Sequence, residues 1–342
     1  MDIVKYKELE AMKYYDKADD TKLSANLLQK KYDIINNKNG EYMATQKWDG
    51  YWMMFIRGES DDEMIIRGRN RNKAGEYENY ACKVPHLVEE MKKWPVNTVV
   101  LGEICWPELN KVATDVGVIL RCLPEKARAR QQQQGLLVVK IFDCLVDNGR
   151  EMMERGYFER YAHAANIAER YGTYFSITEA TYGDFLGFAD DVIRRGGEGC
   201  VIQRCDYIYE PGKRSAWKTL KLKQHLDSAQ YKVLGFLNPK REYEGKCADT
   251  WEYWEGDQAV TRPYALGWKV GVKIELPSGK TCDVSSGMTD SDREWAASDE
   301  AANLLAAGAL YVHVRAMQEA TLGGLRHPVF EGWEYDNKDR VS

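Results

Sequence analysis

A lysine in a short polar motif, Lys47-Trp48-Asp49-Gly50, is the first residue of this chain that could carry covalent chemistry. A lysine amine forms covalent intermediates when it is neutral, and burial or neighbouring positive charge favours the neutral form. A motif this short arises by chance in about one chain in ten of this length at average residue usage. Taken alone, it is better explained as a surface lysine before a tight Asp-Gly turn.

Five further short elements follow this motif along the chain. Each falls at or beside the end of a predicted strand, where a sheet can hold side chains around one cleft. The joint chance of the whole ordered set is far below that of any one element. The elements are Gly68-Arg69-Asn70, Gly102-Glu103, Phe142-Asp143, Glu198-Gly199 and Lys221-Leu222-Lys223.

The strands that would position these side chains are predicted from short apolar and β-branched runs. The run that ends at Asp143 is the strongest signal for a buried strand. Predicted strands cover residues 41–57, 64–67, 97–104, 136–143, 200–203 and 217–223, and predicted helices cover residues 111–134, 151–171 and 182–195.

The sequence changes in texture after Gln224. Short strands are predicted with one Ala-rich helix among them, which is typical of a small barrel of the OB type. The strands cover residues 231–237, 268–276, 281–284 and 311–317, and the helix covers residues 290–307. We therefore expect an α+β chain of two domains, an antiparallel-sheet domain over residues 1–226 and an OB-fold barrel over residues 227–342.

With its motifs in this order, the chain resembles the covalent nucleotidyltransferase superfamily of DNA ligases, RNA ligases and mRNA capping enzymes. The resemblance covers nearly the whole chain. Residues 219–224 resemble the fifth motif of small ATP-dependent DNA ligases, and residues 285–290 and 324–330 resemble parts of their OB domain. These C-terminal features favour the compact bacteriophage and bacterial-repair ligases over capping enzymes.

The resemblance implies a three-step reaction. Lys47 would attack the α-phosphate of ATP and expel pyrophosphate, leaving a covalent lysyl-AMP. The AMP would pass to the 5′-phosphate at a nick in duplex DNA, and the 3′-hydroxyl would then displace it, as replication, repair and recombination require. Lys47 must be neutral to attack, so its pKa is expected to be lowered by burial or by nearby positive charge. Lys221, Lys223 and a bound divalent cation would supply that charge and stabilise the phosphate.

The resemblance also assigns roles around the nucleotide. Phe142 and Val201 would cover the two faces of the adenine, and Thr45, two residues before the nucleophile, would contact its edge through its backbone. Gln46 would also bind the nucleotide. Arg69 and Glu103 would hold the ribose and the nick phosphate. Glu198 is the expected Mg²⁺ ligand, with Glu103 sharing this role, because Mg²⁺ prefers carboxylate and water oxygens. Mn²⁺ remains an alternative metal.

Two positions depart from the family pattern. Many members have Arg five residues after the nucleophile, where this chain has Trp52. The last motif usually supplies an Arg and a Lys that orient pyrophosphate. Lys338 could fill the lysine role, whereas Arg326 and Arg340 are weak candidates for the arginine.

Composition fits a soluble, intracellular protein, and the charge distribution fits either phosphate binding along one face or a solvated basic surface. The 342 residues carry a net charge of −5, but residues 211–246 hold nine Lys/Arg against three Asp/Glu, a basic stretch suited to phosphates. The N-terminus is charged and no apolar run is long enough to span a membrane, so we expect a cytoplasmic monomer without membrane contact. None of the eight Cys forms a C-x-x-C pair, which argues against a zinc site.

Alternatives remain open at this point. An RNA ligase of the same superfamily would share Lys47 and the cleft, and the OB-like tail disfavours it. A capping guanylyltransferase and an NAD⁺-using ligase are further alternatives, the latter disfavoured by chain length and by the missing four-Cys pattern. The chain could also be a nucleic-acid-binding protein without catalysis, which the complete motif set disfavours.

Overall fold

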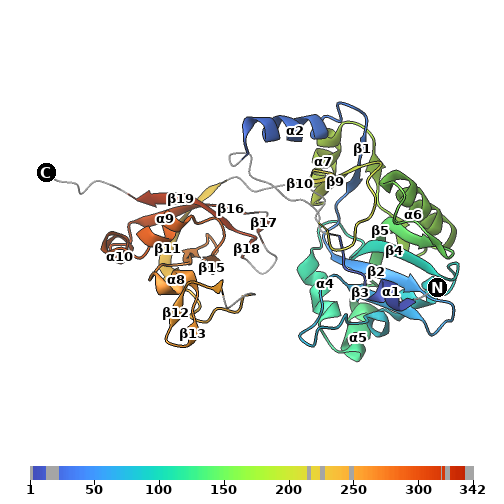
Figure 1. Cartoon of the computed structure of the whole chain (residues 1–342), viewed down its shortest axis with the longest axis horizontal. Helices are drawn as coiled ribbons and strands as arrows, with labels where there is room; N and C mark the ends of the chain where they lie inside the picture. The colour runs from blue at the N-terminus through green and yellow to red at the C-terminus, as the bar shows by residue number, and fades with distance from the viewer. Residues whose placement is uncertain are drawn as a thin grey trace. The chain divides into compact units, whose positions relative to one another are not determined.

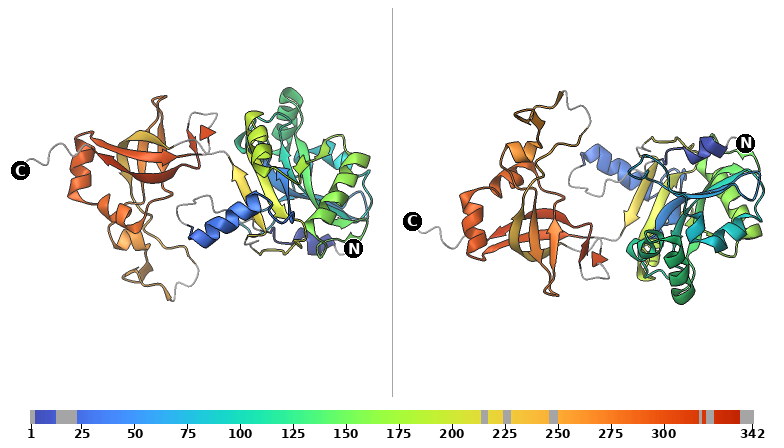
Figure 2. Two further views of the ribbon diagram at one scale, coloured as in Figure 1. Left: turned by 90° about the horizontal axis from the view of Figure 1, so that it is seen from above. Right: turned by 90° about the horizontal axis from the view of Figure 1, so that it is seen from below.

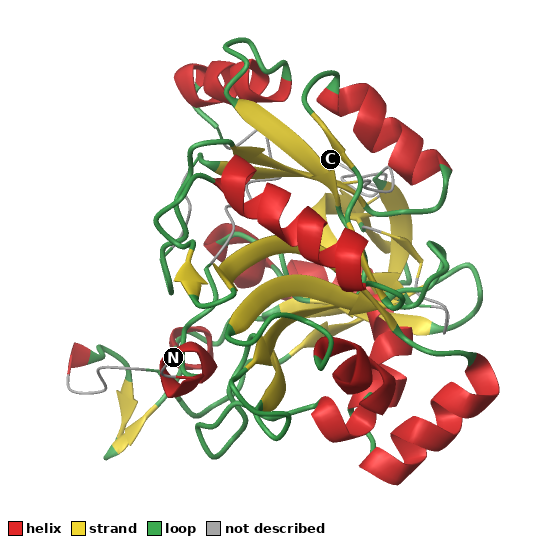
Figure 3. Ribbon diagram, turned by 90° about the vertical axis from the view of Figure 1, so that its right-hand side faces the viewer, coloured by secondary structure: helices red, strands yellow, loops and turns green. Residues whose placement is uncertain are grey.

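The computed structural model describes residues 3–12, 23–213, 217–223, 228–245, 250–316, 318–319 and 324–335. The chain divides into two compact units, Met1–Lys223 and Gln224–Ser342. Helices and strands occur in both (Figure 1), and Figure 3 distinguishes helices from strands by colour. Among the named strands, every pairing is antiparallel except that of β5 with β7. The expected mixture of helices with antiparallel sheets is therefore confirmed.

A four-stranded sheet in the first unit carries the lysine motif. Its order is β10-β9-β1-β8, with β1 at Tyr42–Gln46, β8 at Ala180–Thr181, β9 at Gly199–Arg204 and β10 at Thr219–Lys223. One face, which includes Ala44 and Ile202, packs against α2 (Ala25–Ile35) and α7 (Phe185–Arg194), as Figure 1 shows. Because successive strand residues point to opposite faces, Thr45 and Val201 point away from these helices.

A second sheet forms the other half of this unit. Its order is β3-β2-β4-β5-β6, and β7 pairs with β5. The strands are β2 (Tyr51–Arg57), β3 (Met64–Gly68), β4 (Thr98–Cys105), β5 (Val138–Asp147), β6 (Arg150–Glu151) and β7 (Phe175–Ile177).

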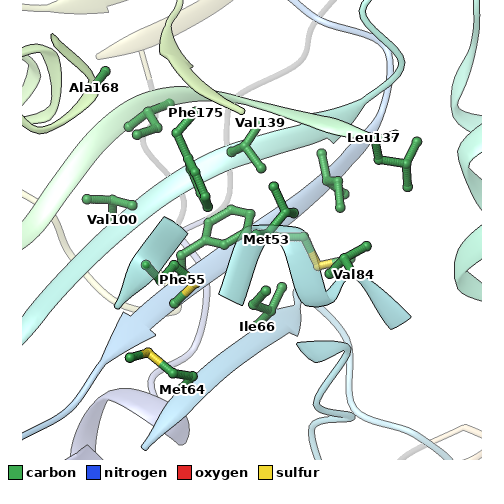
Figure 4. Close-up of a cluster of buried hydrophobic side chains, with 14 of the residues drawn as sticks. Met53, Phe55, Met64, Ile66, Val84, Val100, Leu137, Val139, Ala168 and Phe175 are labelled. Carbon is green, nitrogen blue, oxygen red and sulfur yellow. The ribbon is translucent and has the colours of Figure 1, made fainter. Parts of the chain in front are cut away.

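The main hydrophobic core covers one face of this second sheet. Phe55 and Phe175 meet edge to face within it, with ring centroids 5.1 Å apart (Figure 4). The helices that contribute to this core are α3 (Pro85–Met91), α4 (Ala113–Leu120), α5 (Pro124–Gln134) and α6 (Tyr157–Tyr171). The opposite face holds a smaller cluster that includes Met54 and Leu101, with Trp52 and Phe142 partly buried against it.

A buried ion pair ties α6 to β5. The Arg160 guanidinium donates to both oxygens of Asp143, at 2.8 and 3.1 Å, and both side chains are almost fully buried. Arg160 also donates to the carbonyl oxygens of Arg155 and Tyr207 at 2.6 and 2.7 Å. Each buried charge is thus compensated, as burial requires.

The second unit contains a five-stranded antiparallel sheet in the order β15-β14-β11-β16-β19 (Figure 2). An isolated bridge joins Ser286 to Val329, and the Phe330 N–H donates to the Ser286 oxygen at 2.8 Å. Within the described residues this does not amount to a closed barrel, so the OB fold stays a prediction. The strands are β11 (Ala229–Leu237), β14 (Gly271–Glu275), β15 (Thr281–Val284), β16 (Leu310–Arg315) and β19 (Val329–Tyr335).

Several elements differ from the sequence expectation. The helix expected over residues 111–134 is two helices, because Pro124 lacks the N–H to continue α4 and instead begins α5. The helix expected over residues 290–307 is likewise divided into α9 (Asp290–Trp295) and α10 (Asp299–Ala306), with Ser298 capping the second. Helix α1 (Ile3–Lys7) falls in residues 1–40, where helix and loop were expected. Elements that were not expected include α8 (Arg262–Ala265), the hairpin of β12 (Trp254–Glu255) and β13 (Gln258–Ala259), and the pair β17 (Gln318–Glu319) and β18 (Leu325–Arg326). Within the described ranges, no helix has the length and apolar character to cross a bilayer.

Candidate active site

Lys47 lies directly after β1 and is held by two partners on β9 or beside it. Its backbone N–H donates to the Gly199 oxygen at 2.8 Å, and its ammonium forms an ion pair with Glu198. The other oxygen of Glu198 lies 3.8 Å from the Lys223 Nζ. The Glu198 side chain is only 6% exposed, compared with 20% for Lys47. A buried carboxylate therefore lies between Lys47, directly after β1, and Lys223 of β10.

Gly199 allows this approach. Its φ is +124°, and a Cβ at this position would lie 2.1 Å from the Leu222 oxygen and 3.2 Å from the Lys223 Cα. A side chain would thus force β9 away from β10 at the point where Glu198 meets Lys223. The close contact between the backbones of β9 and β10 explains why glycine follows Glu198 in this motif.

The Asp-Gly half of the lysine motif has its own structural role. Asp49 accepts a hydrogen bond from the Ala113 N–H at 3.3 Å, at the start of α4. A Cβ on Gly50 would lie 2.2 Å from the Ile104 oxygen of β4. The loop after Lys47 is therefore fastened to both α4 and β4 and is not a free surface turn.

The electrostatics differ from the expectation for Lys47. Burial lowers the pKa of Lys47, but Glu198, Glu103 and Asp49 together raise it above the ordinary lysine value. The expectation of a lowered pKa is wrong for the protein without nucleotide, because the carboxylates outweigh burial. Burial is also the main cause that raises the pKa of Glu103 to about 7. Glu198 contributes to this rise, whereas Lys47 lowers the pKa.

Cross-strand register places three more of the predicted residues beside Lys47. Thr45 pairs with Val201, and Val201 pairs with Lys221, so the three share one face of the sheet with Lys47 and Lys223. Gln46 points to the opposite face, toward α7, and its N–H donates to the Glu179 oxygen at 2.8 Å. The side chain of Gln46 therefore points away from Lys47, Thr45 and Val201, and only its backbone can contribute to that face.

Trp52, Glu103 and Arg69 come together on the second sheet. Trp52 and Glu103 are paired across β2 and β4, and the Arg69 guanidinium lies 5.5 Å from the Trp52 ring centroid. Electrostatic coupling of Glu103 to both Lys47 and Arg69 links this group to the first sheet. The aromatic residue that replaces the expected arginine thus carries a cation above its ring.

Phe142 lies at an irregularity between β4 and β5. Leu101 pairs with Asp143 and Gly102 with Ile141, so Phe142 is an extra residue on β5. Such a bulge turns a side chain out of the regular alternation. Phe142 is half-buried on the Glu103 side of the sheet, while Ile141 enters the main core.

Lys140 is a site residue that sequence reasoning missed. It pairs with Glu103 across β4 and β5. Its Nζ lies 2.9 Å from the Ser176 Oγ and 4.6 Å from the ring centroid of Trp48, the residue after Lys47. In the sequence, Lys140 is the one charged residue in the apolar run before Asp143, and this could have marked it as a candidate site residue. Asp49, counted only as a turn residue, was missed in the same way, and Lys338 lies outside the described residues.

Comparison with known proteins shows which family this chain matches. Residues 23–223 match the family described as the ATP dependent DNA ligase domain. A DNA ligase of Thermococcus fumicolans is 22% identical over 209 residues, which is 59% of this chain but 36% of that protein. This chain therefore spans about a third of the length of that relative.

Two solved structures have a similar fold. One, from work on DNA binding by Lig E DNA ligases with a minimal scaffold, has a TM-score of 0.61 at 17% identity and covers 95% of this chain and 98% of its own. The other, Pmar-Lig_PreS3, has a TM-score of 0.63 at 17% identity and covers 95% of this chain and 67% of its own. Because the family match spans more than half of the sequence and contains the whole Lys47–Glu198–Lys223 group, this chain belongs to the ATP-dependent DNA ligase domain family.

Proposed function

We propose that this chain is an ATP-dependent DNA ligase that seals 3′-hydroxyl/5′-phosphate nicks in duplex DNA through lysyl-AMP on Lys47. The observation that carries the proposal is the contact of Lys47 with Glu198, with Lys223 on the other side of that carboxylate. A lysine next to a buried acid and a second cation has both a proton acceptor and a charge that can hold a phosphate.

In the first step the neutral Lys47 Nζ attacks the α-phosphorus of ATP. The P–N bond forms as the P–O bond to pyrophosphate breaks, and pyrophosphate leaves. Glu198 is the acceptor in contact with the ammonium and takes the proton that Lys47 must lose. Lys221 and Lys223, on the same sheet face, stabilise the negative charge that develops on the phosphate.

The remaining residues orient the nucleotide. Phe142 and Val201 hold the adenine from the second and first sheets, and the backbone of Thr45 and Gln46 lies at its edge. Arg69 and Glu103 hold the ribose in the first step and the nick phosphate in the later ones.

A divalent cation fits the buried carboxylate of Glu198 and the partly buried carboxylate of Glu103. Among the described residues no group of three or more His, Cys, Asp or Glu could hold a metal. Mg²⁺ is commonly bound by one or two carboxylates together with water and substrate phosphate, and Glu198 and Glu103 meet that need. When bound, Mg²⁺ or Mn²⁺ supplies positive charge that stabilises phosphate oxygens and competes with the ammonium for Glu198.

The second half of the chain is proposed to bind the duplex. We assign residues 1–226 to adenylation and residues 227–342 to an OB-fold domain, acting as a monomer. The five-stranded antiparallel sheet supports this assignment, as does the bridge from Ser286 to Val329.

The test is transfer of label from ATP labelled at the α-phosphate. With Mg²⁺ present, the wild-type chain should become labelled, and Lys47→Ala should not. Persistent labelling of Lys47→Ala would overturn the assignment. The labelled protein is then offered nicked DNA, nicked RNA and single-stranded RNA. Sealing of an RNA substrate in preference to nicked DNA would instead support an RNA ligase.

A further inference from the structure

The face of the four-stranded sheet that bears Lys47, called here the Lys47 face, contains three cross-strand rows. Each row takes one residue from each of β1, β9 and β10 or their ends. The rows are Lys47–Gly199–Lys223, Thr45–Val201–Lys221 and Met43–Gln203–Thr219.

Exposure to solvent falls from the first row to the third. Along the first strand it drops from 20% for the Lys47 side chain to 3% for Thr45 and 0% for Met43. Gln203 and Thr219, in the third row, are 2% and 1% exposed. The Lys47 face is therefore accessible at the lysines and closed at the row that contains Gln203.

Gln203 carries an unsatisfied polar atom at this closed end. Its Oε1 is buried and has no hydrogen-bond partner in the part of the chain that the structure describes. Buried polar atoms are normally paired, and leaving one unpaired is destabilising. Such an atom on a ligand-binding face points to a partner that arrives with the ligand.

The spacing of the rows matches one nucleotide. Adjacent rows are two residues apart along a strand, so the first and third are separated by about 13 Å. This is comparable to the distance from the phosphate of a nucleoside monophosphate to the far edge of its base. With the α-phosphate at Lys47 and the base over Val201, the far edge of the base faces Gln203.

We propose that Gln203 determines nucleobase specificity, its Oε1 accepting a hydrogen bond from the 6-amino group of adenine. This inference rests on the proposed function, since it takes the orientation of the nucleotide from the attack by Lys47. Adenine has a donor at position 6 where guanine has an acceptor. An acceptor at the closed end therefore pairs with adenine and opposes guanine.

The decisive comparison removes the amino group from the nucleotide. GTP alone is less informative, because a carboxamide can turn over and present its NH₂. The full-length protein and Gln203→Met are each titrated with ATP and with purine riboside triphosphate, which lacks the 6-amino group. The readout is the nucleotide concentration that gives half-maximal formation of the covalent lysyl nucleotide.

The wild type should prefer ATP to the analogue by about tenfold, the size expected of one buried hydrogen bond. In Gln203→Met the half-maximal concentration should rise about tenfold for ATP and stay unchanged for the analogue. The Tm of the nucleotide-free variant should be equal to or above that of the wild type, because an unpaired buried oxygen is removed. Gln29→Met, at an exposed glutamine that bonds Asp33, is the matched control and should change neither titration.

An equal loss for both nucleotides, or no loss for ATP, overturns the role of Gln203. Should Gln203→Met fail to fold, Gln203→Asn withdraws the same oxygen by one methylene, and retention of the full preference for ATP in that variant also overturns it. Absence of labelling of the wild type by either nucleotide overturns the proposed function instead.

Discussion

The Lys47 ammonium and the Glu198 carboxylate form a direct ion pair in the protein without nucleotide. The pair links β1 to the start of β9, and Lys223 lies 3.8 Å from its acidic partner. The acid that is placed to accept the proton of Lys47 also raises the pKa of that lysine. Lys47, the proposed nucleophile, is therefore held in its charged form while this ion pair persists.

Replacing Glu198 should separate these two effects. In Glu198→Gln the pKa of Lys47 is expected to fall, because a carboxylate that raises it is gone. Formation of lysyl-AMP should nevertheless slow by about 100-fold, because the proton acceptor is also lost. Titration of ¹³C-methylated lysines by NMR measures the first effect, and single-turnover labelling measures the second.

Glu125→Gln, at an exposed acid on α5, is the matched control and should leave both measurements unchanged. If the Lys47 titration is the same in Glu198→Gln and in wild type, Glu198 does not hold the lysine in its charged form.

Glu103 should make stability depend on pH. Burial raises its pKa from 4.5 to about 7, so the folded state binds more protons than the unfolded state between these values. Stability is accordingly lost as the pH rises through this window. Glu103→Gln removes this loss of stability. The difference in free energy of unfolding, variant minus wild type, should therefore increase between pH 4.5 and pH 7, by no more than about 3 kcal/mol.

Urea unfolding of the full chain at several pH values measures the difference. Glu108→Gln, at an exposed acid after β4, provides the comparison. A stability difference between wild type and Glu103→Gln that stays flat with pH would show that Glu103 is ionised throughout.

Gly199 should tolerate no side chain. Gly199→Ala places a Cβ 2.1 Å from the Leu222 oxygen at a φ of +124°. We expect a loss of at least about 1–3 kcal/mol in stability from the backbone strain alone, together with slower labelling as Glu198 moves from Lys223. Gly183→Ala, where a Cβ would meet nothing within 4 Å, is the control. Equal thermal stability of these two variants is the result that contradicts this account.

Features that depend on neighbouring residues could be predicted from the sequence, whereas features that depend on the pairing of distant strands could not. The strand predicted over residues 136–143 corresponds to β5 at Val138–Asp147, because its apolar run is local, and Lys47 and Glu198 were selected as candidates because their motifs are local too. The position of Gln203 depends on the register between β9 and β10, and the bulge at Phe142 on that between β4 and β5. Register arises from pairing between distant segments, so a single sequence gives little indication of it.

The expectation for the Lys47 pKa failed for a related reason. From sequence, burial or the positive charges of Lys221, Lys223 and a bound divalent cation were expected to lower the pKa of Lys47. In the folded chain Glu198, Glu103 and Asp49 act on Lys47 as well, and their combined effect outweighs burial. The sign of a pKa shift depends on the balance of nearby charges, which requires positions in space.

The ion pair of Arg160 with Asp143 should be essential for stability but not for chemistry. Removing one partner leaves the other charged and buried, so Arg160→Leu is expected to lose about 3–5 kcal/mol of stability. Arg155→Leu, at a half-exposed arginine 3.9 Å from Glu159, should lose far less, because exposed pairs contribute little. Urea unfolding followed by circular dichroism compares the two variants. At a temperature where Arg160→Leu remains folded, its rate of lysyl-AMP formation should be within about twofold of wild type, since the Arg160 guanidinium donates to Asp143 and to the carbonyl oxygens of Arg155 and Tyr207. A folded Arg160→Leu protein that fails to label would mean that this pair positions the nucleotide through the neighbouring Phe142.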